Sequence, residues 1–135
     1  PEVDLLQSIP GVGPVYAALI AVEIGDIGRF RDSNHLASYA GVAPRKEESG
    51  TSVHKRRKRK GGNRRLKNAL MQSSQRSVQC DPVARAYYER KRAEGKKHLQ
   101  ALRALARHRV TVIFAMLNEG TFYEPPVEVD EDGSG

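Results

Sequence analysis

Hydrophobic residues recur at the i, i+3, i+4 spacing of an amphipathic helix near the end of the chain. This stripe predicts one long helix from about Lys97 to Asn118, with Gly120 as its stop. The hydrophobic positions of the stripe are Leu99, Leu102, Leu105, Ala106, Val110, Ile113 and Leu117. The buried side of the long helix should therefore lie along these residues.

An earlier stripe predicts a helix that Asn63 caps and that runs to about Val78. Its inward face should carry Leu66, Ala69, Leu70, Ser73 and Ser77. The next residues predict another helix, because Asp81 is a favoured N-cap and Pro82 a favoured first position. That helix should end before Gly95.

Two further helices are predicted near the N-terminus. Val3–Ser8 has the apolar spacing of a short helix, and Val15–Ile24 is rich in Ala and aliphatic residues up to the stop at Gly25. Between them, Ile9–Pro14 contains two glycines and two prolines, which predicts a tight turn. The arrangement is a helix-hairpin-helix pattern.

A short helix over His35–Ala40 should follow a loop, with Ser33 or Asn34 as its cap and Gly41 as its stop. The next segment, Val42–Gly62, has no helical periodicity. We interpret it as a long basic loop or a loose hairpin. Loops of this length in a compact domain are usually functional or disordered.

The predicted fold class is therefore mainly all-α. A helix-hairpin-helix at residues 4–25 is followed by an irregular basic loop at 44–62 and by three C-terminal helices within 63–119. Residues 1–123 form the expected domain, and residues 124–135 an acidic, disordered tail. With 135 residues, the sequence has the length of one domain.

Charge is distributed unevenly along this pattern. Residues 45–109 hold 21 Lys and Arg against five acidic residues, a net charge of +16, whereas residues 1–44 carry −3 and residues 110–135 carry −6. Such a basic segment repels itself and favours a polyanionic partner, with nucleic acid ahead of a membrane surface. No apolar run is long enough to span a membrane, and we expect no secretory signal. The single Cys80 excludes an internal disulfide and a cysteine-based zinc cluster, which favours an intracellular location.

Two segments are candidates for contact with phosphate groups. Gly11 and Gly13 in the tight turn would let backbone N–H groups approach a phosphate at the start of the second helix. The turn could equally serve packing alone. The stronger candidate is the cationic run of the predicted loop, which continues into the next helix. Its members are Lys55, Arg56, Arg57, Lys58, Arg59 and Lys60, followed by Arg64 and Arg65.

One hydroxyl in the loop has surroundings suited to phosphodiester chemistry. Ser49 precedes a glycine and follows Arg45 and Lys46, which could neutralise an attacked phosphate. No base or metal ligand set is evident beside it, so an ordinary loop serine is the interpretation that the residues favour. The four histidines lack metal-ligand spacing, and we expect no metal site in this chain.

Several of these motifs occur in an order that resembles the C-terminal domain of transposases of the insertion-sequence-110 family, which is also grouped with insertion sequences 116 and 902. The resemblance extends over about residues 4–120. Its landmarks are Ile9–Pro14, Ile24–Asp26 with Phe30, Leu36–Arg45, Ser49 with Gly50, Lys60–Leu66, Asp81 with Pro82, and Leu117–Gly120.

The resemblance implies a DNA recombinase whose serine becomes covalently linked to DNA. That serine corresponds to Ser49, with Ser52 in reserve. Catalysis would also need an N-terminal RuvC-like domain that holds divalent metal such as Mg²⁺, so this chain is expected to bind DNA without recombining it. The implied partners are element ends, target DNA, a structured guide RNA and other copies of the protein, in the prokaryotic cytoplasm near the nucleoid.

Two alternatives remain open. The chain could be a helix-hairpin-helix module that binds nucleic acid without chemistry, which would tolerate Ser49→Ala in every assay. The acidic tail from Glu124 to Asp132 could also imitate nucleic acid and cover the basic loop. Deletion of the tail should then tighten DNA binding at low salt.

Overall fold

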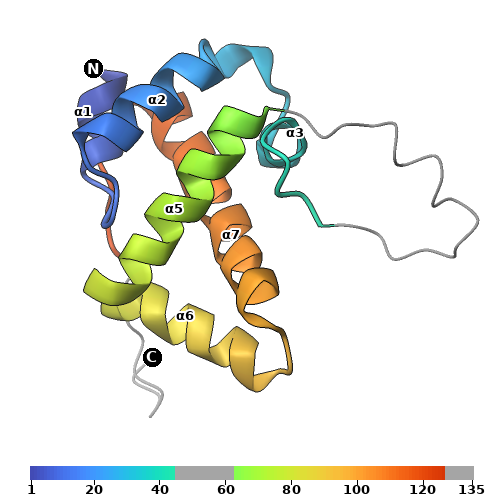
Figure 1. Cartoon of the computed structure of the whole chain (residues 1–135). Coiled ribbons are helices and arrows are strands. Elements are labelled where there is room, and N and C mark those ends of the chain that lie inside the picture. Colours follow the sequence, from blue (N-terminus) through green and yellow to red (C-terminus); the bar gives the residue numbers. More distant parts are fainter. Residues whose placement is uncertain (45–62, 127–135) are drawn as a thin grey trace, which may run out of the picture.

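The computed structural model describes residues 1–44 and 63–126, and these two ranges contain six α-helices, one 3₁₀ helix and no strand (Figure 1). The prediction of a mainly helical fold is confirmed. The elements in chain order are α1 (Glu2–Gln7), α2 (Pro14–Ile24), η1 (Ile27–Arg29), α3 (Ser33–Tyr39), α5 (Arg64–Cys80), α6 (Pro82–Ala93) and α7 (His98–Glu119). The predictions for the loop at 45–62 and for the tail at 127–135 lie outside the described residues.

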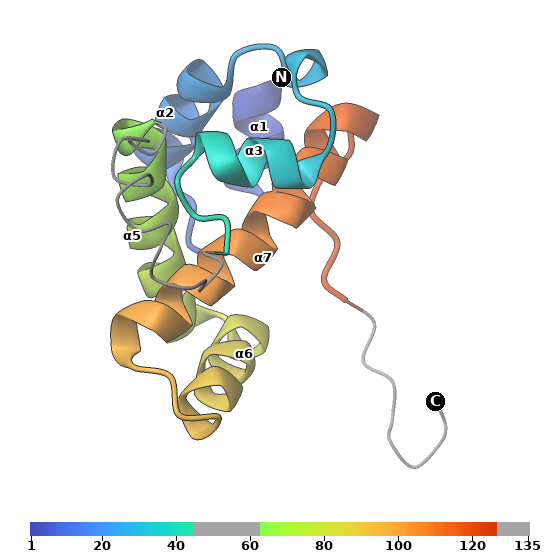
Figure 2. The ribbon, with the colours of Figure 1, turned by 90° about the vertical axis from the view of Figure 1, so that its right-hand side faces the viewer.

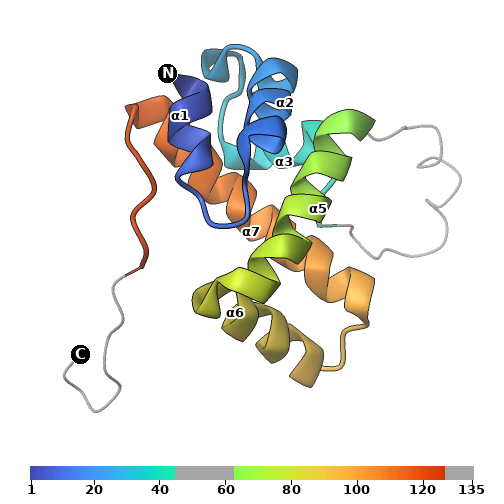
Figure 3. The same cartoon turned by 60° about the vertical axis from the view of Figure 1, so that its left-hand side comes forward.

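The long helix α7 is the element around which the others pack. α1, α3, α5, α6 and η1 all contact it, and α2 packs on α1 and α5 (Figures 1 and 2). α5 crosses α7, and α6 forms a hairpin with the start of α7 at the end of the molecule away from α1 (Figure 3). None of the helices in the described ranges has the length and apolar character that a bilayer span requires.

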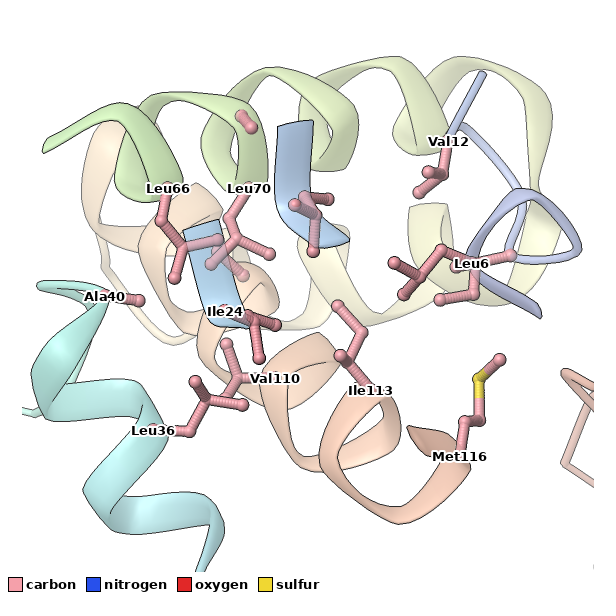
Figure 4. Close-up of a cluster of buried hydrophobic side chains, with 14 of the residues drawn as sticks. Leu6, Val12, Ile24, Leu36, Ala40, Leu66, Leu70, Val110, Ile113 and Met116 are labelled. Atoms are coloured by element: carbon pink, nitrogen blue, oxygen red, sulfur yellow. The ribbon is translucent and has the colours of Figure 1, made fainter. Parts of the chain in front are cut away.

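The core lies where α1, α2, α3 and α5 meet α7 (Figure 4). Leu6, Ile24, Leu36, Leu66 and Ile113 are almost completely buried there. The predicted inward face of α5 is confirmed at every position, including Ser73 and Ser77.

The predicted stripe of α7 is wrong at its first residue, because Leu99 is 65% exposed. Leu99 lies one turn before Arg103, whose Nη1 donates to the carbonyl oxygen of Gly41 after α3. Ala101 and Leu102, two and three residues later, are almost completely buried, so Leu99 lies on the outward-facing side of α7. Helical spacing alone does not show which side of this end of the helix a neighbour covers.

Side-chain caps fix the starts of three helices. Asn63 and Asp81 cap α5 and α6 as predicted, since their side chains accept from the backbone N–H of Leu66 and Val83. The cap predicted for α3 is wrong. Asp32, rather than Ser33 or Asn34, accepts from the N–H of His35 at 2.9 Å, because the helix already begins at Ser33.

Candidate nucleic-acid interface

Asn63, the first described residue after the predicted basic loop, belongs to a polar cluster with Glu23 and Tyr39. The backbone N–H of Asn63 donates to the carbonyl oxygen of Tyr39 at 2.6 Å. The Nδ2 of Asn63 donates to Oε1 of Glu23 at 2.8 Å and to the hydroxyl of Tyr39 at 3.1 Å. The end of α2, the end of α3 and the start of α5 are therefore joined where the chain returns to the described fold.

Arg29 stabilises this cluster from the side of η1. Its Nε and Nη2 donate to the carbonyl oxygen of Ile24 at 3.1 and 2.8 Å. These bonds give a partner to a carbonyl group that has none within α2, at the C-terminal end of the helix. Its guanidinium also lies 4.7 Å from the ring centroid of Phe30 and 5.0 Å from that of Tyr39. Hydrogen bonding by Asn63, and then by Arg29, holds the pKa of Tyr39 below its ordinary value of 10.0.

Two of the predicted phosphate-contacting cations, Arg64 and Arg65, lie exposed in the first turn of α5. No acidic residue stands in that turn of the described helix. The N-terminal end of a helix carries partial positive charge, so cations there oppose the helix dipole. Within the described ranges, Nη1 of Arg65 lies 3.6 Å from Oε2 of Glu23. This accumulation of positive charge is suited to an anion that contacts both the arginines and the helix N-terminus.

The remaining predicted residues of the basic loop lie outside the described part of the chain. They are Arg45, Lys46, Ser49, Ser52, Lys55, Arg56, Arg57, Lys58, Arg59 and Lys60. The structure places the residues on either side of them, Pro44 after α3 and Asn63 before α5. The role of Ser49 as a nucleophile and the contacts of the cationic run stay predictions.

Gly11 packs against α5 with φ at +90°, which L side chains rarely adopt. A Cβ atom at Gly11 would lie 2.7 Å from the carbonyl oxygen of Ser73 and 2.9 Å from Ser77. The need for glycine here is explained by the approach of two backbones. Contact of Gly11 with phosphate stays a prediction.

Gly13 differs from Gly11 in both conformation and surroundings. It is the exposed N-cap of α2, with φ at −86°, and a Cβ atom there would meet nothing within 4 Å. The turn contacts α5 at Ser73 and Ser77, about 12 to 18 Å along the helix from Arg65. The described residues thus keep the turn apart from the arginines of α5.

A second basic cluster lies on α6 and α7, outside the predicted phosphate-contacting residues. Tyr87 stacks on His108, with ring centroids 5.1 Å apart and planes at 4°. Arg90 and Lys91 lie 5.2 and 5.4 Å from the centroid of the Tyr87 ring. The sequence shows the spacing of the arginines and lysines on α6. It does not show that Tyr87 stacks on His108, which lies 21 residues later.

The other described histidines have local partners. Nδ1 of His35 accepts from the backbone N–H of Arg31 at 3.1 Å, and His98 shares a 2.8 Å hydrogen bond with the hydroxyl of Tyr88. Among the described residues, no group of three or more His, Cys, Asp or Glu side chains could hold a metal ion. The described part of the chain therefore offers a basic surface rather than a metal centre.

Comparison with known proteins adds a family pattern to this geometry. Residues 3–89 match the pattern described as "Transposase IS116/IS110/IS902 family". The matched stretch extends from α1 through most of α6 and includes the polar cluster at Asn63.

Curated relatives match over nearly the whole chain. The chain is 51% identical to the insertion element IS110 43.6 kDa protein of Streptomyces coelicolor, over 92% of this chain and 31% of the relative. It is 39% identical to the IS900 42 kDa protein of Mycobacterium paratuberculosis, over 90% of this chain and 31% of the relative. It is 35% identical to a pilin gene-inverting protein of Moraxella bovis, over 86% of this chain and 37% of the relative. The chain thus spans about a third of the length of these relatives, in their C-terminal part.

Proposed function

The chain belongs to the IS116/IS110/IS902 family of transposases, and we propose that it is the DNA-contacting, serine-bearing C-terminal domain of a recombinase that mobilises an insertion sequence. One observation carries the proposal beyond family membership. The polar cluster of Glu23, Tyr39 and Asn63 joins the end of α3 to the residue before α5, and the segment that contains Ser49 and the cationic run lies between these two points in the sequence. A hydrogen-bonded base of this kind suits a segment that must present a reactive group on a fixed scaffold.

The basic surface supplies the affinity for nucleic acid in this proposal. Arg64 and Arg65 extend the cationic run Lys55–Lys60 onto the first turn of α5. Contacts from these residues to phosphates would position the DNA without reading its bases. If six to eight phosphates were neutralised, log K would fall with log salt with a slope of roughly −5 to −7.

Ser49 is the nucleophile in this proposal. Its hydroxyl oxygen attacks a phosphodiester, a bond forms between that oxygen and phosphorus, and one bridging DNA oxygen leaves with a proton. The product is a phosphoserine ester, which conserves the free energy of the cleaved phosphodiester bond so that the strand can be rejoined. Arg45 and Lys46 would balance the negative charge on the non-bridging oxygens of the attacked phosphate.

The rest of the reaction depends on parts outside this chain. The described residues do not fit a metal site, so the divalent metal that the family resemblance implies would be held by an N-terminal RuvC-like domain. A structured guide RNA and further copies of the protein complete the proposed assembly. The chain on its own should bind DNA and show no strand transfer.

The test uses the full-length transposase that carries this chain, with its RNA and Mg²⁺, on end-labelled element-junction DNA. A denaturing gel should show a protease-sensitive protein–DNA band that Ser49→Ala abolishes while DNA binding stays normal. Ser38→Ala is the matched control, because Ser38 is exposed on α3 within the described residues.

Each other outcome points to a different function. A band that survives Ser49→Ala and is lost in Ser52→Ala would move the nucleophile to Ser52. Recombination without any covalent band would assign the attack to water or a DNA hydroxyl. Full activity of both serine variants would leave the chain as a nucleic-acid-binding module without chemistry, which is the alternative function.

A further inference from the structure

The hairpin of α6 and α7 carries a compact group of aromatic and cationic side chains, none of which belongs to the polar cluster at Asn63. The rings of Tyr87 and His108 stack in parallel, and the hydroxyl of Tyr87 donates to the carbonyl oxygen of Ala104 at 3.4 Å. Two elements thus fix the pair, Tyr87 from α6 and His108 from α7. His108 as a whole residue is exposed.

Cations surround this stacked pair. Arg90 and Lys91 lie over the Tyr87 ring from α6, and Arg107 precedes His108 on α7. Burial first, and then the positive charges of Arg107, Arg109, Arg90 and Lys91, lower the pKa of His108 below 6.5. Each of these charged neighbours repels the protonated ring, so His108 experiences a positive local potential.

Acidic residues in this hairpin are few. On α6 and the turn after it, Glu89 and Glu94 are the acids beside Arg85, Arg90, Lys91 and Arg92. Glu94 is engaged with Lys91 at 3.5 Å. On α7, the first acid after His98 is Glu119, at the far end of the helix. Intramolecular ion pairs in the described residues therefore leave most of this positive charge uncompensated.

Another arginine of α7, one helical turn before Arg107, contacts the segment after α3. Arg103 precedes Arg107 by one helical turn, about 6 Å along α7. Nη1 of Arg103 donates to the carbonyl oxygen of Gly41 at 3.2 Å, three residues before Pro44. A nucleic acid that contacts residues near Pro44 could thus continue along the outer side of α7.

We propose that Tyr87, Arg90, Lys91, Arg107 and His108 form a second phosphodiester-binding site, which holds the backbone of the nucleic acid beyond the basic loop. This inference rests on the proposed function, because it names a further contact for the same nucleic acid. The ligand chemistry is the phosphodiester backbone. Arg supplies paired donors to phosphate oxygens, and the stacked rings hold Arg90 and Lys91 over one spot.

The test compares Arg90→Gln/Arg107→Gln with Arg31→Gln/Arg76→Gln in the 135-residue chain. Both double variants lose two positive charges, and Arg31 and Arg76 are exposed residues outside the cluster. Fluorescence anisotropy measures the Kd for a 20-base-pair DNA duplex and for a structured RNA of similar length over a range of salt concentrations. The cluster variant should reduce the salt slope by about 2 and weaken binding by roughly tenfold near 0.1 M salt. The control should change the slope by less than half as much.

A second readout reports directly on the site. The His108 ring can be titrated by NMR with and without bound nucleic acid. Bound phosphate should raise the pKa of His108, since an anion favours the protonated ring. Arg31→Gln/Arg76→Gln should preserve that rise. A slope change with DNA only, or with RNA only, would support the site and identify which nucleic acid occupies it.

Failure of the proposed function and failure of the second site give different results. A wild-type chain that binds neither duplex nor RNA would overturn the proposed function. A wild-type chain that binds, with equal slopes for the two double variants and no rise in the His108 pKa, would overturn the second site and leave the proposed function intact. Circular dichroism of each variant establishes that it is folded before binding is measured.

Discussion

Nη2 of Arg109 donates to the carbonyl oxygen of Pro10 at 2.6 Å, which ties the tight turn between α1 and α2 to α7 across 99 residues. Arg109 is only 7% exposed, and burial lowers the pKa of its guanidinium. On its other side, the turn meets α5 through Gly11. The turn is therefore held between two helices, and its sequence is under a packing constraint whatever it binds.

Gly11→Ala should destabilise the fold by about 2–4 kcal/mol, because it adds a Cβ atom at positive φ against the backbone of α5. Urea unfolding followed by circular dichroism measures the change. Gly13→Ala is the matched control, since a Cβ atom there meets nothing within 4 Å, and it should cost less than about 1 kcal/mol. Normal stability of Gly11→Ala together with weaker DNA binding would instead assign Gly11 to phosphate contact.

Asn63→Ala should cost about 2 kcal/mol, because it removes the cap of α5 and the donors to Glu23 and Tyr39. Asn63→Asp keeps the capping oxygen but places a carboxylate beside Glu23, so it should also be destabilised at neutral pH. Asn68→Ala provides the comparison, because Asn68 is exposed within the same helix and Ala favours helix. Equal stabilities for Asn63→Ala and Asn68→Ala would show that the polar cluster contributes nothing to the fold.

Much of the helical framework could be predicted from the sequence because its causes are local. Asn63 and Asp81 cap helices that start directly after them, and the stripe on α5 is set by helical spacing. The cap of α3 was misplaced by one or two residues, since Asp32, Ser33 and Asn34 are all good N-caps and lie together. Only the observed start of the helix distinguishes them.

The sites were harder to predict because they depend on contacts between distant segments. The contact between Gly11 and Ser73 spans more than 60 residues, so the sequence left packing and phosphate binding as equal alternatives. The stack of Tyr87 on His108 arises only when α6 folds back on α7. The assignment of Ser49 comes from family resemblance and stays a prediction.

Ser74→Ala should stabilise the protein by about 0.5–1 kcal/mol. Ser74 is fully buried, and its hydroxyl has no hydrogen-bond partner within the described structure. Replacement removes an unsatisfied polar atom and introduces a better helix former. Ser77→Ala is the matched control, because the Ser77 hydroxyl donates to the carbonyl oxygen of Ser74 at 2.7 Å, and its loss should not stabilise the fold. A destabilised Ser74→Ala protein would mean that the hydroxyl has a partner after all.

His108 should make the fold less stable as the solution becomes acidic. Because its pKa is lower in the folded chain than the ordinary 6.5, the unfolded chain binds more protons between those two values. The contribution of His108 to the free energy of unfolding is therefore present above about pH 6.5 and is lost as the pH falls below it. His108→Gln should lose less stability than the wild type between pH 7.5 and pH 5.

Arg107→Gln gives an independent check on the cause, because Arg107 is the first charged neighbour that lowers the pKa of His108. This substitution should raise the pKa of His108 in an NMR titration and reduce the loss of stability at acidic pH. Arg31→Gln changes the same charge in the segment before α3 and should leave the His108 titration as it is in the wild type. If Arg107→Gln left the pKa of His108 unchanged while His108→Gln still removed the pH dependence, Arg107 would not contribute to the shift, and burial together with Arg109, Arg90 and Lys91 would account for it.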